Sequence, residues 1–269
     1  MIRFPGSFFL RNLVGHRSLL FQLVRRDFEQ RFVGSAAGWL WGVIHPLVLL
    51  LSWTFVFDVC LKMPLGSGEL TQHYPIWLFC GFLPWLLFQE TLQRSATCLV
   101  EQASLVKKTM FPSEIAPVAI FLSSLVNHFI GLVLATAGVA WWEKRFSAMI
   151  FVLPVYILLL GLFSIGIAWV VSALHVYLRD TAQVLSVLLT LWFWLTPIMI
   201  SGERYPMRLR FLIAINPMAY LVKAYRERLM SYRPPDVREL AIVAAYAFVT
   251  FIIGGLFFRH LKRGFADVL

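Results

Sequence analysis

Charged residues are scarce in this sequence. Asp, Glu, Lys and Arg make up 14% of its 269 residues, against roughly a quarter in soluble domains. Hydrophobic residues make up 59%, and the mean hydropathy is +0.75. This balance excludes a soluble globular domain and indicates a chain whose surface mostly faces lipid.

Motifs for binding nucleotides and metals are also missing. The sequence has no G-x-x-x-x-G-K-[ST] phosphate loop, no G-x-G-x-x-G and no H-E-x-x-H. We therefore expect no catalytic residue, no metal site and no cofactor on this chain, and we expect any ATP hydrolysis, with its Mg²⁺, on another polypeptide. The few cysteines have neither the number nor the spacing of a disulfide framework or metal site; they are Cys60, Cys80 and Cys98.

Long apolar runs, by contrast, are abundant. A transmembrane helix needs about 20 mostly apolar residues, and we predict one all-α integral membrane domain over residues 1–269. The first run begins too late and is too long for a cleavable signal peptide. Six segments are predicted to span the membrane: residues 36–61, 75–98, 115–142, 148–175, 182–201 and 239–258.

The distribution of Lys and Arg predicts the orientation. With the N-terminus in the cytoplasm, the inner segments hold 13 of these residues and the outer loops 62–74 and 142–147 hold three. Cytoplasmic loops carry such an excess, so we expect both termini in the cytoplasm. We attribute the net charge of +10 to basic flanks on anionic membrane lipids, not to nucleic acid.

Residues 201–238 depart from this rule. They would lie outside, yet they carry eight basic residues and a twelve-residue apolar run, 211–222, interrupted at Asn216 and Pro217. Twelve residues are too few to cross a bilayer as a helix, and Asn-Pro signals a turn. We predict a short re-entrant helical hairpin between the fifth and sixth spans. A seventh span with altered topology is the competing interpretation.

Two of the predicted spans differ in polarity. The fourth, 148–175, has no charged residue, and we expect much of its surface to face lipid. The second has an uninterrupted apolar part only over 75–88, and we expect the polar face after it to point at protein or water. That face comprises Gln89, Glu90, Gln93 and Arg94.

An amphipathic segment precedes the first span. We predict an interface helix over residues 17–33 that lies in the headgroup plane of the membrane. Asp27 and Arg31 lie at its apolar edge, where an i,i+4 pair partly neutralises both charges. The apolar arc consists of Leu20, Phe21, Val24, Phe28 and Phe32, and the opposite face of Gln22, Arg25, Arg26 and Glu29.

A glycine-containing joint connects this helix to the first span. Gly34, Ser35 and Gly38 fall where the amphipathic pattern stops and the apolar run begins. A passive anchor, which is the alternative interpretation, does not need such a joint. We predict a hinge that lets the interface helix transmit movement from a cytoplasmic partner.

The longest cytoplasmic loop, 101–114, combines charged with apolar residues. Apolar side chains in a solvent-exposed loop favour a docking surface, and an ordinary interfacial turn is the alternative. The candidate docking residues are Glu101, Lys107, Lys108, Met110, Phe111, Pro112 and Glu114.

Aromatic residues supply the candidate channel wall. Trp53 and Phe57 share one face of the first span, and Trp192 and Trp194 lie within the fifth. Stacked aromatic faces suit sugar rings in a conduit, whereas packing against lipid is the alternative. Isolated histidines within the spans are expected to hydrogen-bond between helices; they are His45, His128 and His175.

Several motifs occur in a fixed order along nearly the whole chain. They resemble the motifs of type 2 ABC exporter permeases, in the branch that exports O-antigen, teichoic-acid and capsular polysaccharides. The motifs are RDFEQRFVGS at 26–35 followed by Gly38, Trp41 and Pro46, then KTMFPSE at 108–114, YLRD at 177–180, TPI at 196–198, Asn216-Pro217 through Arg226, and FADV at 265–268.

This resemblance implies a homodimer of six-span subunits in the bacterial inner membrane, docked on two copies of a separate ATP-binding subunit. Residues 17–33 and 101–114 would meet that subunit. The first and fifth spans would line a channel at the dimer interface, and residues 205–230 would form gate helices on the periplasmic side. The candidate gate residues are Tyr205, Asn216, Pro217, Tyr220 and Arg226.

The function implied is export of a polyprenyl-diphosphate-linked glycan, most directly O-antigen, with capsular polysaccharide as the alternative in the same class. We infer that Arg25 and Arg26 contact the charged head of this lipid. A permease for small lipids or drugs and an integral-membrane transferase acting on prenyl-linked sugars are further alternatives. The transferase would need converging acidic residues, whereas those available are dispersed: Glu90, Glu101, Glu114 and Asp180.

Overall fold

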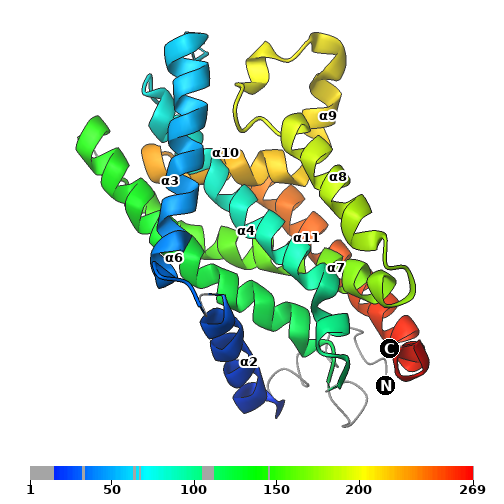
Figure 1. Ribbon diagram of the computed structural model, residues 1–269. Coiled ribbons are helices and arrows are strands. Elements are labelled where there is room, and N and C mark those ends of the chain that lie inside the picture. The colour runs from blue at the N-terminus through cyan, green and yellow to red at the C-terminus, as the bar shows by residue number, and fades with distance from the viewer. Residues whose placement is uncertain are drawn as a thin grey trace.

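The computed structural model describes residues 15–31, 34–62, 65–66, 68–104, 112–144 and 146–268. These residues form helices and contain no β-strand, which confirms the predicted all-α class. Helices α2 (Arg17–Gln30) and α12 (Phe265–Val268) lie at one end of the molecule, here called the α2 end (Figure 1). Helices α9 (Arg210–Ala214) and α10 (Pro217–Met230) lie toward the opposite end, called the α10 end.

Long helices connect the two ends. They are α3 (Trp41–Thr54), α4 (Tyr74–Glu101), α6 (Ile115–Glu143), α7 (Leu153–Tyr177), α8 (Thr181–Leu195) and α11 (Val237–Leu261). A π-helical turn, Phe55–Cys60, continues α3. Single 3₁₀ turns cover Gly38–Leu40, Ala148–Val152, Gly202–Arg204, Met207–Leu209 and Lys262–Gly264.

Four helical segments among the described residues are long and apolar enough to cross a membrane. They coincide with the first, third, fourth and sixth predicted spans. Of the other two, α4 has 28 residues but a polar second half, and α8 has only 15 residues, or about 22 Å against a hydrocarbon core of about 30 Å. A total of six spans therefore stays a prediction. The four segments are Gly38–Cys60, Ile115–Glu143, Ala148–Tyr177 and Val237–Gly264.

The fifth predicted span, 182–201, is not one continuous helix. α8 ends at Leu195, and Thr196 is extended, with φ −98° and ψ 134°. Proline disfavours helical backbone at the residue before it, so Pro197 explains this end. The backbone carbonyls that follow are free of the helical ladder and become available to a neighbouring side chain.

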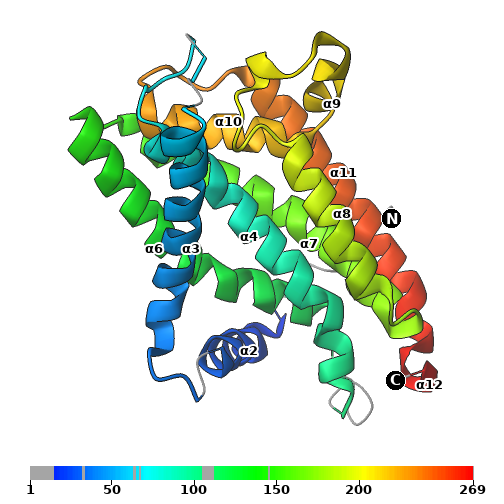
Figure 2. The ribbon, with the colours of Figure 1, turned by 45° about the horizontal axis from the view of Figure 1, so that its top comes forward.

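The centre of the bundle is formed by α4 and α7. α4 packs against α6, α7 and α10 (Figures 1 and 2), and Trp77 and Trp85 on it are fully buried. The expectation that 148–175 faces lipid is wrong, because α7 lies between α4 and α11 with Leu160 and Trp169 fully buried. An uncharged apolar helix packs equally well against lipid and against protein, so composition alone does not distinguish them.

Close backbone approach holds α7 against α11. A Cβ placed on Gly166 would lie 2.5 Å from the Thr250 carbonyl oxygen, and one on Gly254 would overlap the carbonyl of Gly166. Small residues permit this approach between helices in a membrane. The atoms that an added Cβ would meet are backbone atoms of both helices, so no flexible side chain could move aside to make room.

The predicted interruption at Asn216 and Pro217 is confirmed. α9 ends at Ala214 and α10 begins at Pro217, where the ring sets the first helical φ. The Asn216 side chain accepts a hydrogen bond from the Met218 N–H at 3.0 Å and so caps α10. Whether this hairpin re-enters a membrane stays a prediction.

We predict that Gly254→Ala lowers the free energy of unfolding by about 1–3 kcal/mol, the usual cost of overpacking. Gly138→Ala on α6 is the matched control, because the nearest atom to a Cβ there is the Trp142 ring at 4.0 Å. Alanine in an open helical position stabilises by up to about 1 kcal/mol. Thermal unfolding of the purified protein in detergent measures both variants, and equal midpoints would contradict close packing at Gly254.

Candidate functional site

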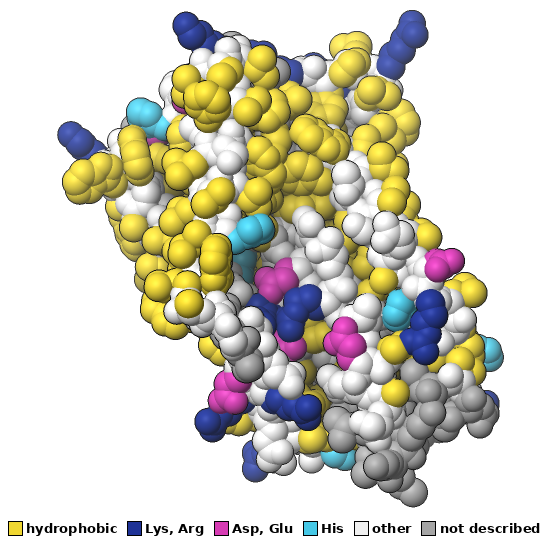
Figure 3. All heavy atoms as spheres, in the orientation of Figure 1, with side chains coloured by type: hydrophobic (Ala, Val, Ile, Leu, Met, Phe, Trp, Pro, Cys, Tyr) yellow, Lys and Arg dark blue, Asp and Glu magenta, His cyan; other side chains and the backbone are white. Residues whose placement is uncertain are grey.

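A cavity of about 1040 Å³ opens on one side of the bundle. Its lining residues come from α2, α3, α4, α6 and α8, so helices distant in sequence meet around it. Figure 3 shows the hollow between hydrophobic flanks, with acidic and basic side chains gathered in its lower part, toward the α2 end. The cavity is thus polar near the α2 end and more apolar beyond it.

Four charged side chains form the polar floor of this cavity, and we call them the charge ring. Arg94 on α4 binds Asp27 on α2 through two hydrogen bonds, Nη2 to Oδ1 at 2.6 Å and Nη1 to Oδ2 at 3.0 Å. Arg31 on α2 donates to the Glu90 carboxylate on α4 and, at 2.9 Å, to Ser124 Oγ on α6. Two-point pairing of this kind fixes orientation as well as distance.

Pairs within each helix close the ring. Arg31 Nε lies 3.6 Å from Asp27 Oδ2, and Arg94 Nη1 lies 4.0 Å from Glu90 Oε1. Both are i,i+4 pairs, so each helix presents one acid and one base on one face. Burial lowers the pKa of the Arg31 guanidinium from its ordinary value, and the Glu90 carboxylate opposes that shift.

The charge ring explains the polar face predicted on the second span. Glu90 and Arg94 do turn toward protein, as expected, and their partners are Asp27 and Arg31 of the interface helix. The sequence pattern showed Asp27 and Arg31 only as a pair at an apolar edge. It carried no signal for pairing between helices, because their partners lie more than 50 residues away.

The packing face of α2 agrees only in part with the predicted arc. Leu20 and Val24 of the arc are partly buried against the cluster of Leu23, Ile115 and Ala119, whereas Phe21 of the arc is 69% exposed. Leu23 and Asp27 are four residues apart and so lie on one face. Hydrophobicity alone centred the arc too far from Leu23, since it counted Asp27 as unfavourable for burial.

The predicted hinge has the backbone of a glycine joint. Gly34 has φ +78° and Gly38 has φ +53°, conformations that side chains rarely adopt, and a Cβ on either would meet no atom within 4 Å. The glycines are therefore required by backbone conformation and not by packing. Ser35 lies between them, and α3 starts three residues after Gly38.

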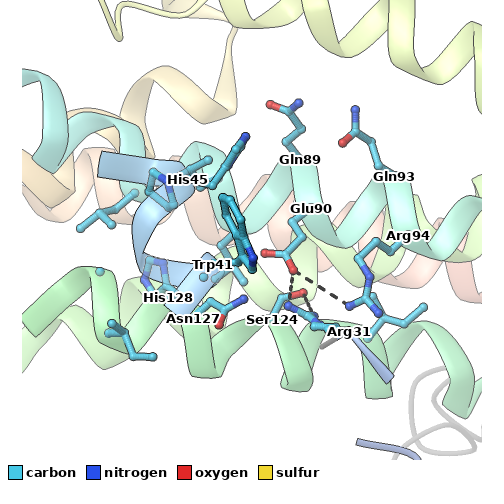
Figure 4. Close-up of a pocket in the computed structure, with 18 of the residues that line it drawn as sticks. Arg31, Trp41, His45, Gln89, Glu90, Gln93, Arg94, Ser124, Asn127 and His128 are labelled. Atoms are coloured by element: carbon cyan, nitrogen blue, oxygen red, sulfur yellow. Dashed lines mark hydrogen bonds and ion pairs between the residues drawn. The ribbon is translucent and has the colours of Figure 1, made fainter. Parts of the chain in front are cut away.

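Uncharged amide side chains form a wall above the charge ring. Gln89 and Gln93 project from one side of α4, on the side of that helix opposite to Glu90, and line the cavity together with Trp41 of α3 (Figure 4). Gln89 Oε1 accepts a hydrogen bond from Trp85 Nε1 at 2.6 Å. Asn127 and His45 line the same cavity. None of these residues was assigned a binding role from sequence.

The four aromatic channel candidates have different environments. Trp53 lines the cavity, with its ring centroid 4.6 Å from that of Phe82 and 5.5 Å from that of Phe193. The other candidates are not lining residues. Phe57 stacks on Tyr74, Trp192 packs on Phe88 and Phe163, and Trp194 is exposed.

Arg226 holds the α10 end together. Its guanidinium donates to the carbonyls of Trp77 at 3.1 Å, Pro197 at 2.8 Å and Ile198 at 2.7 Å, and lies 3.4 Å above the Trp77 ring. Two of these carbonyls follow the end of α8 at Pro197. One buried side chain thus ties α10 to α4 and to the end of α8.

The remaining gate candidates make local contacts. Asn216 accepts from Trp192 Nε1 and donates to Thr196 Oγ1, both at 2.9 Å. The Tyr205 hydroxyl donates to the Trp194 carbonyl, and the Tyr220 hydroxyl donates to that of Ala214. The bonds of Asn216 and Tyr205 link the hairpin region to the end of α8, and that of Tyr220 joins α10 to α9; none of them tests a gating role.

The candidate docking loop is only partly described. Lys107, Lys108, Met110 and Phe111 lie outside the described residues. Glu101 ends α4 and lines the cavity, and the Pro112 carbonyl accepts the Ile115 N–H. The Glu114 carboxylate pairs with Lys262 at 2.5 Å, so the C-terminal segment lies beside the start of α6.

The two candidate head-group contacts are not equivalent. Arg25 pairs with Glu29 at 2.8 Å on the exposed face of α2 and is absent from the cavity lining. Arg26 lines the cavity and is exposed. Of the histidines, His128 Nε2 lies 3.0 Å from the Tyr225 hydroxyl, which places it between α6 and α10 as expected of an interhelical contact.

Comparison with known proteins identifies relatives. The family model for the ABC-2 type transporter matches residues 18–230. An O-antigen export system permease protein RfbA of Myxococcus xanthus is 27% identical, over 96% of this chain and 98% of that protein. Two proteins of the same name from Klebsiella pneumoniae are 24% and 23% identical, each over 93% of this chain and 95% of its relative. Since the family model covers most of its length, this chain belongs to the ABC-2 type transporter family.

Proposed function

We propose that this chain is the membrane-spanning permease subunit of an ATP-driven exporter that moves lipid-linked O-antigen across the bacterial inner membrane. The observation that carries the proposal is similarity from end to end, since 96% of this chain aligns with 98% of the Myxococcus xanthus permease. The two chains therefore share one organisation. ATP hydrolysis, with its Mg²⁺, belongs to a separate ATP-binding subunit.

The transported glycan passes through a conduit made by two copies of this chain. Support comes from exposed apolar side chains on the two helices that flank the cavity, since extended exposed apolar surface marks a contact with protein or lipid. Joining two copies through these flanks encloses both cavities. The side chains are Val48 and Leu51 on α3, Phe55 just after it, and Val187, Leu191 and Trp194 on α8.

Two ATP-binding subunits dock at the α2 end. α2, the end of α4, the start of α6 and α12 all lie there (Figure 1). Movement of α2 reaches α4 through the charge ring and α3 through the joint at Gly34 and Gly38. Arg26 contacts the diphosphate of the lipid in this proposal; its support is that Arg26, unlike Arg25, lines the cavity.

We infer that the α2 end lies in the cytoplasm and the α10 end in the periplasm. Six spans, α3, α4, α6, α7, α8 and α11, give this arrangement with both termini inside. α4 crosses despite its polar half because that half faces α2 and the cavity. The α9–α10 hairpin then lies at the outer mouth.

Deleting the gene for this chain is expected to remove O-antigen from the cell surface while lipid-linked O-antigen accumulates inside. Restoring the chain should reverse both effects. Surface staining and extraction of the lipid-linked pool provide the two measurements. Unchanged surface O-antigen would contradict the proposed function.

Single cysteines at Met207 and Ile215, which are 83% and 57% exposed, should react with a membrane-impermeant maleimide added to the periplasm. Val222→Cys should not react, since Val222 is fully buried. The background replaces Cys60, Cys80 and Cys98. Arg179→Cys, on the exposed connection between α7 and α8, should react only from the cytoplasm; labelling of all exposed sites from one side overturns the topology.

Arg94→Gln should reduce export and stability, because it leaves the Asp27 carboxylate without its two hydrogen bonds. Asp27→Asn combined with Arg94→Gln should recover part of the lost stability and export. Removing both charged partners destabilises the protein less than leaving one of them buried without its partner. We expect a coupling free energy of about 1–3 kcal/mol in the double-mutant cycle. Thermal unfolding in detergent and surface O-antigen are measured in parallel.

The matched control for the charge ring is Glu29→Gln. It breaks the Arg25–Glu29 pair on the same helix, where both side chains are more than half exposed. Exposed pairs contribute at most about 1 kcal/mol, so this variant should stay close to wild type. Additive effects of Asp27→Asn and Arg94→Gln would show that the ring does not act as a unit.

A further inference from the structure

The polar groups available to a ligand in the cavity are mainly uncharged. Three basic and three acidic side chains line it, and four of these six are committed to the charge ring. A cavity for an anionic ligand would carry a clear excess of basic groups, and one for an acyl chain would lack polar walls. Neither description fits the wall above the ring.

Gln89 and Gln93 provide that wall. They are four residues apart on α4, so their side chains share one face and are separated by about 6 Å along the helix axis. Each amide group offers two donor hydrogens and an acceptor oxygen. The Gln89 amide oxygen accepts from Trp85, and no hydrogen bond of the Gln93 amide occurs among the described residues. Donors and an acceptor therefore face the cavity together.

Trp41 completes the arrangement from the opposite helix. It is the first residue of α3, it is 53% exposed, and it lines the same cavity (Figure 4). An indole combines a broad apolar face with one N–H donor. Paired donors and acceptors beside an aromatic face complement a ring that carries hydroxyl groups on its edge and C–H groups on its face.

We propose that Gln89, Gln93 and Trp41 form a binding subsite for an uncharged, hydroxyl-bearing sugar of the transported glycan, just above the charge ring. The inference rests on the proposed function and adds a location and a selectivity to it. The subsite recognises the sugar and not the diphosphate or the lipid tail. The two amides lie on the buried central helix α4, so their wall of the subsite is fixed. Trp41 lies on α3, which follows the glycine joint, so the opposite wall moves with that helix.

The test uses the complex of this chain with its ATP-binding partner, purified in lipid nanodiscs. Two probes are compared: a polyprenyl diphosphate that carries a neutral oligosaccharide, and the same lipid without sugar. Gln93→Ala should weaken binding of the glycosylated probe about threefold to tenfold, as expected for one or two lost hydrogen bonds. Gln89→Ala/Gln93→Ala should weaken it further, and binding of the bare lipid should stay unchanged.

Gln183→Ala is the matched control, because Gln183 is an exposed glutamine of α8 outside the cavity lining. Gln93→Ala decides the outcome, since Gln93 is exposed and its amide makes no hydrogen bond among the described residues, so its removal leaves the fold intact. Equal binding of the glycosylated probe to this variant and to wild type overturns the subsite. Equal loss of both probes overturns it as well, because the sugar is then not what the amide contacts. Failure of wild type to bind either probe refutes the proposed function itself.

Discussion

Neutralising charge at the edge of an apolar bundle is the constraint on which this structure depends. Asp27, Arg31, Glu90 and Arg94 lie where α2 and α4 meet. An unpaired charge at that position would raise the free energy of the folded protein. Each helix contributes an acid and a base four residues apart, so one relative placement of α2 and α4 satisfies all four groups. The charge ring therefore fixes the interface helix against the central helix and forms a floor without excess charge.

At the α10 end, a buried charge is stabilised in a different way. Arg226 is buried and satisfied by three backbone carbonyls, two of which are released because Pro197 ends α8. Carbonyls are fixed by the backbone, whereas the charge ring is made of side chains that have several rotamers. The α10 end is thus built as a rigid clamp, and the α2 end as a contact between separate helices.

Between these ends the cavity combines properties that transport of a glycan requires. Its floor is electrically balanced, its wall offers uncharged donors and acceptors, and aromatic side chains from α3, α4 and α8 cover its upper part. Such a surface holds a hydroxylated chain through contacts that are each weak, so movement along it does not require breaking a strong ion pair. The glycine joint places one of its walls on a helix that is connected directly to α2.

The sequence by itself determined the helical class, the helix before the first span, the glycine joint at Gly34 and Gly38, and the break at Asn216, because these follow from local apolar periodicity and from residues with restricted or unusual backbone freedom. Only the tertiary structure decided which charges pair, that Leu23 is the buried residue of α2, that α7 is central, and that Gln89, Gln93 and Trp41 line one cavity. Those outcomes depend on contacts between residues distant in sequence, and hydropathy does not distinguish a lipid neighbour from an apolar helix.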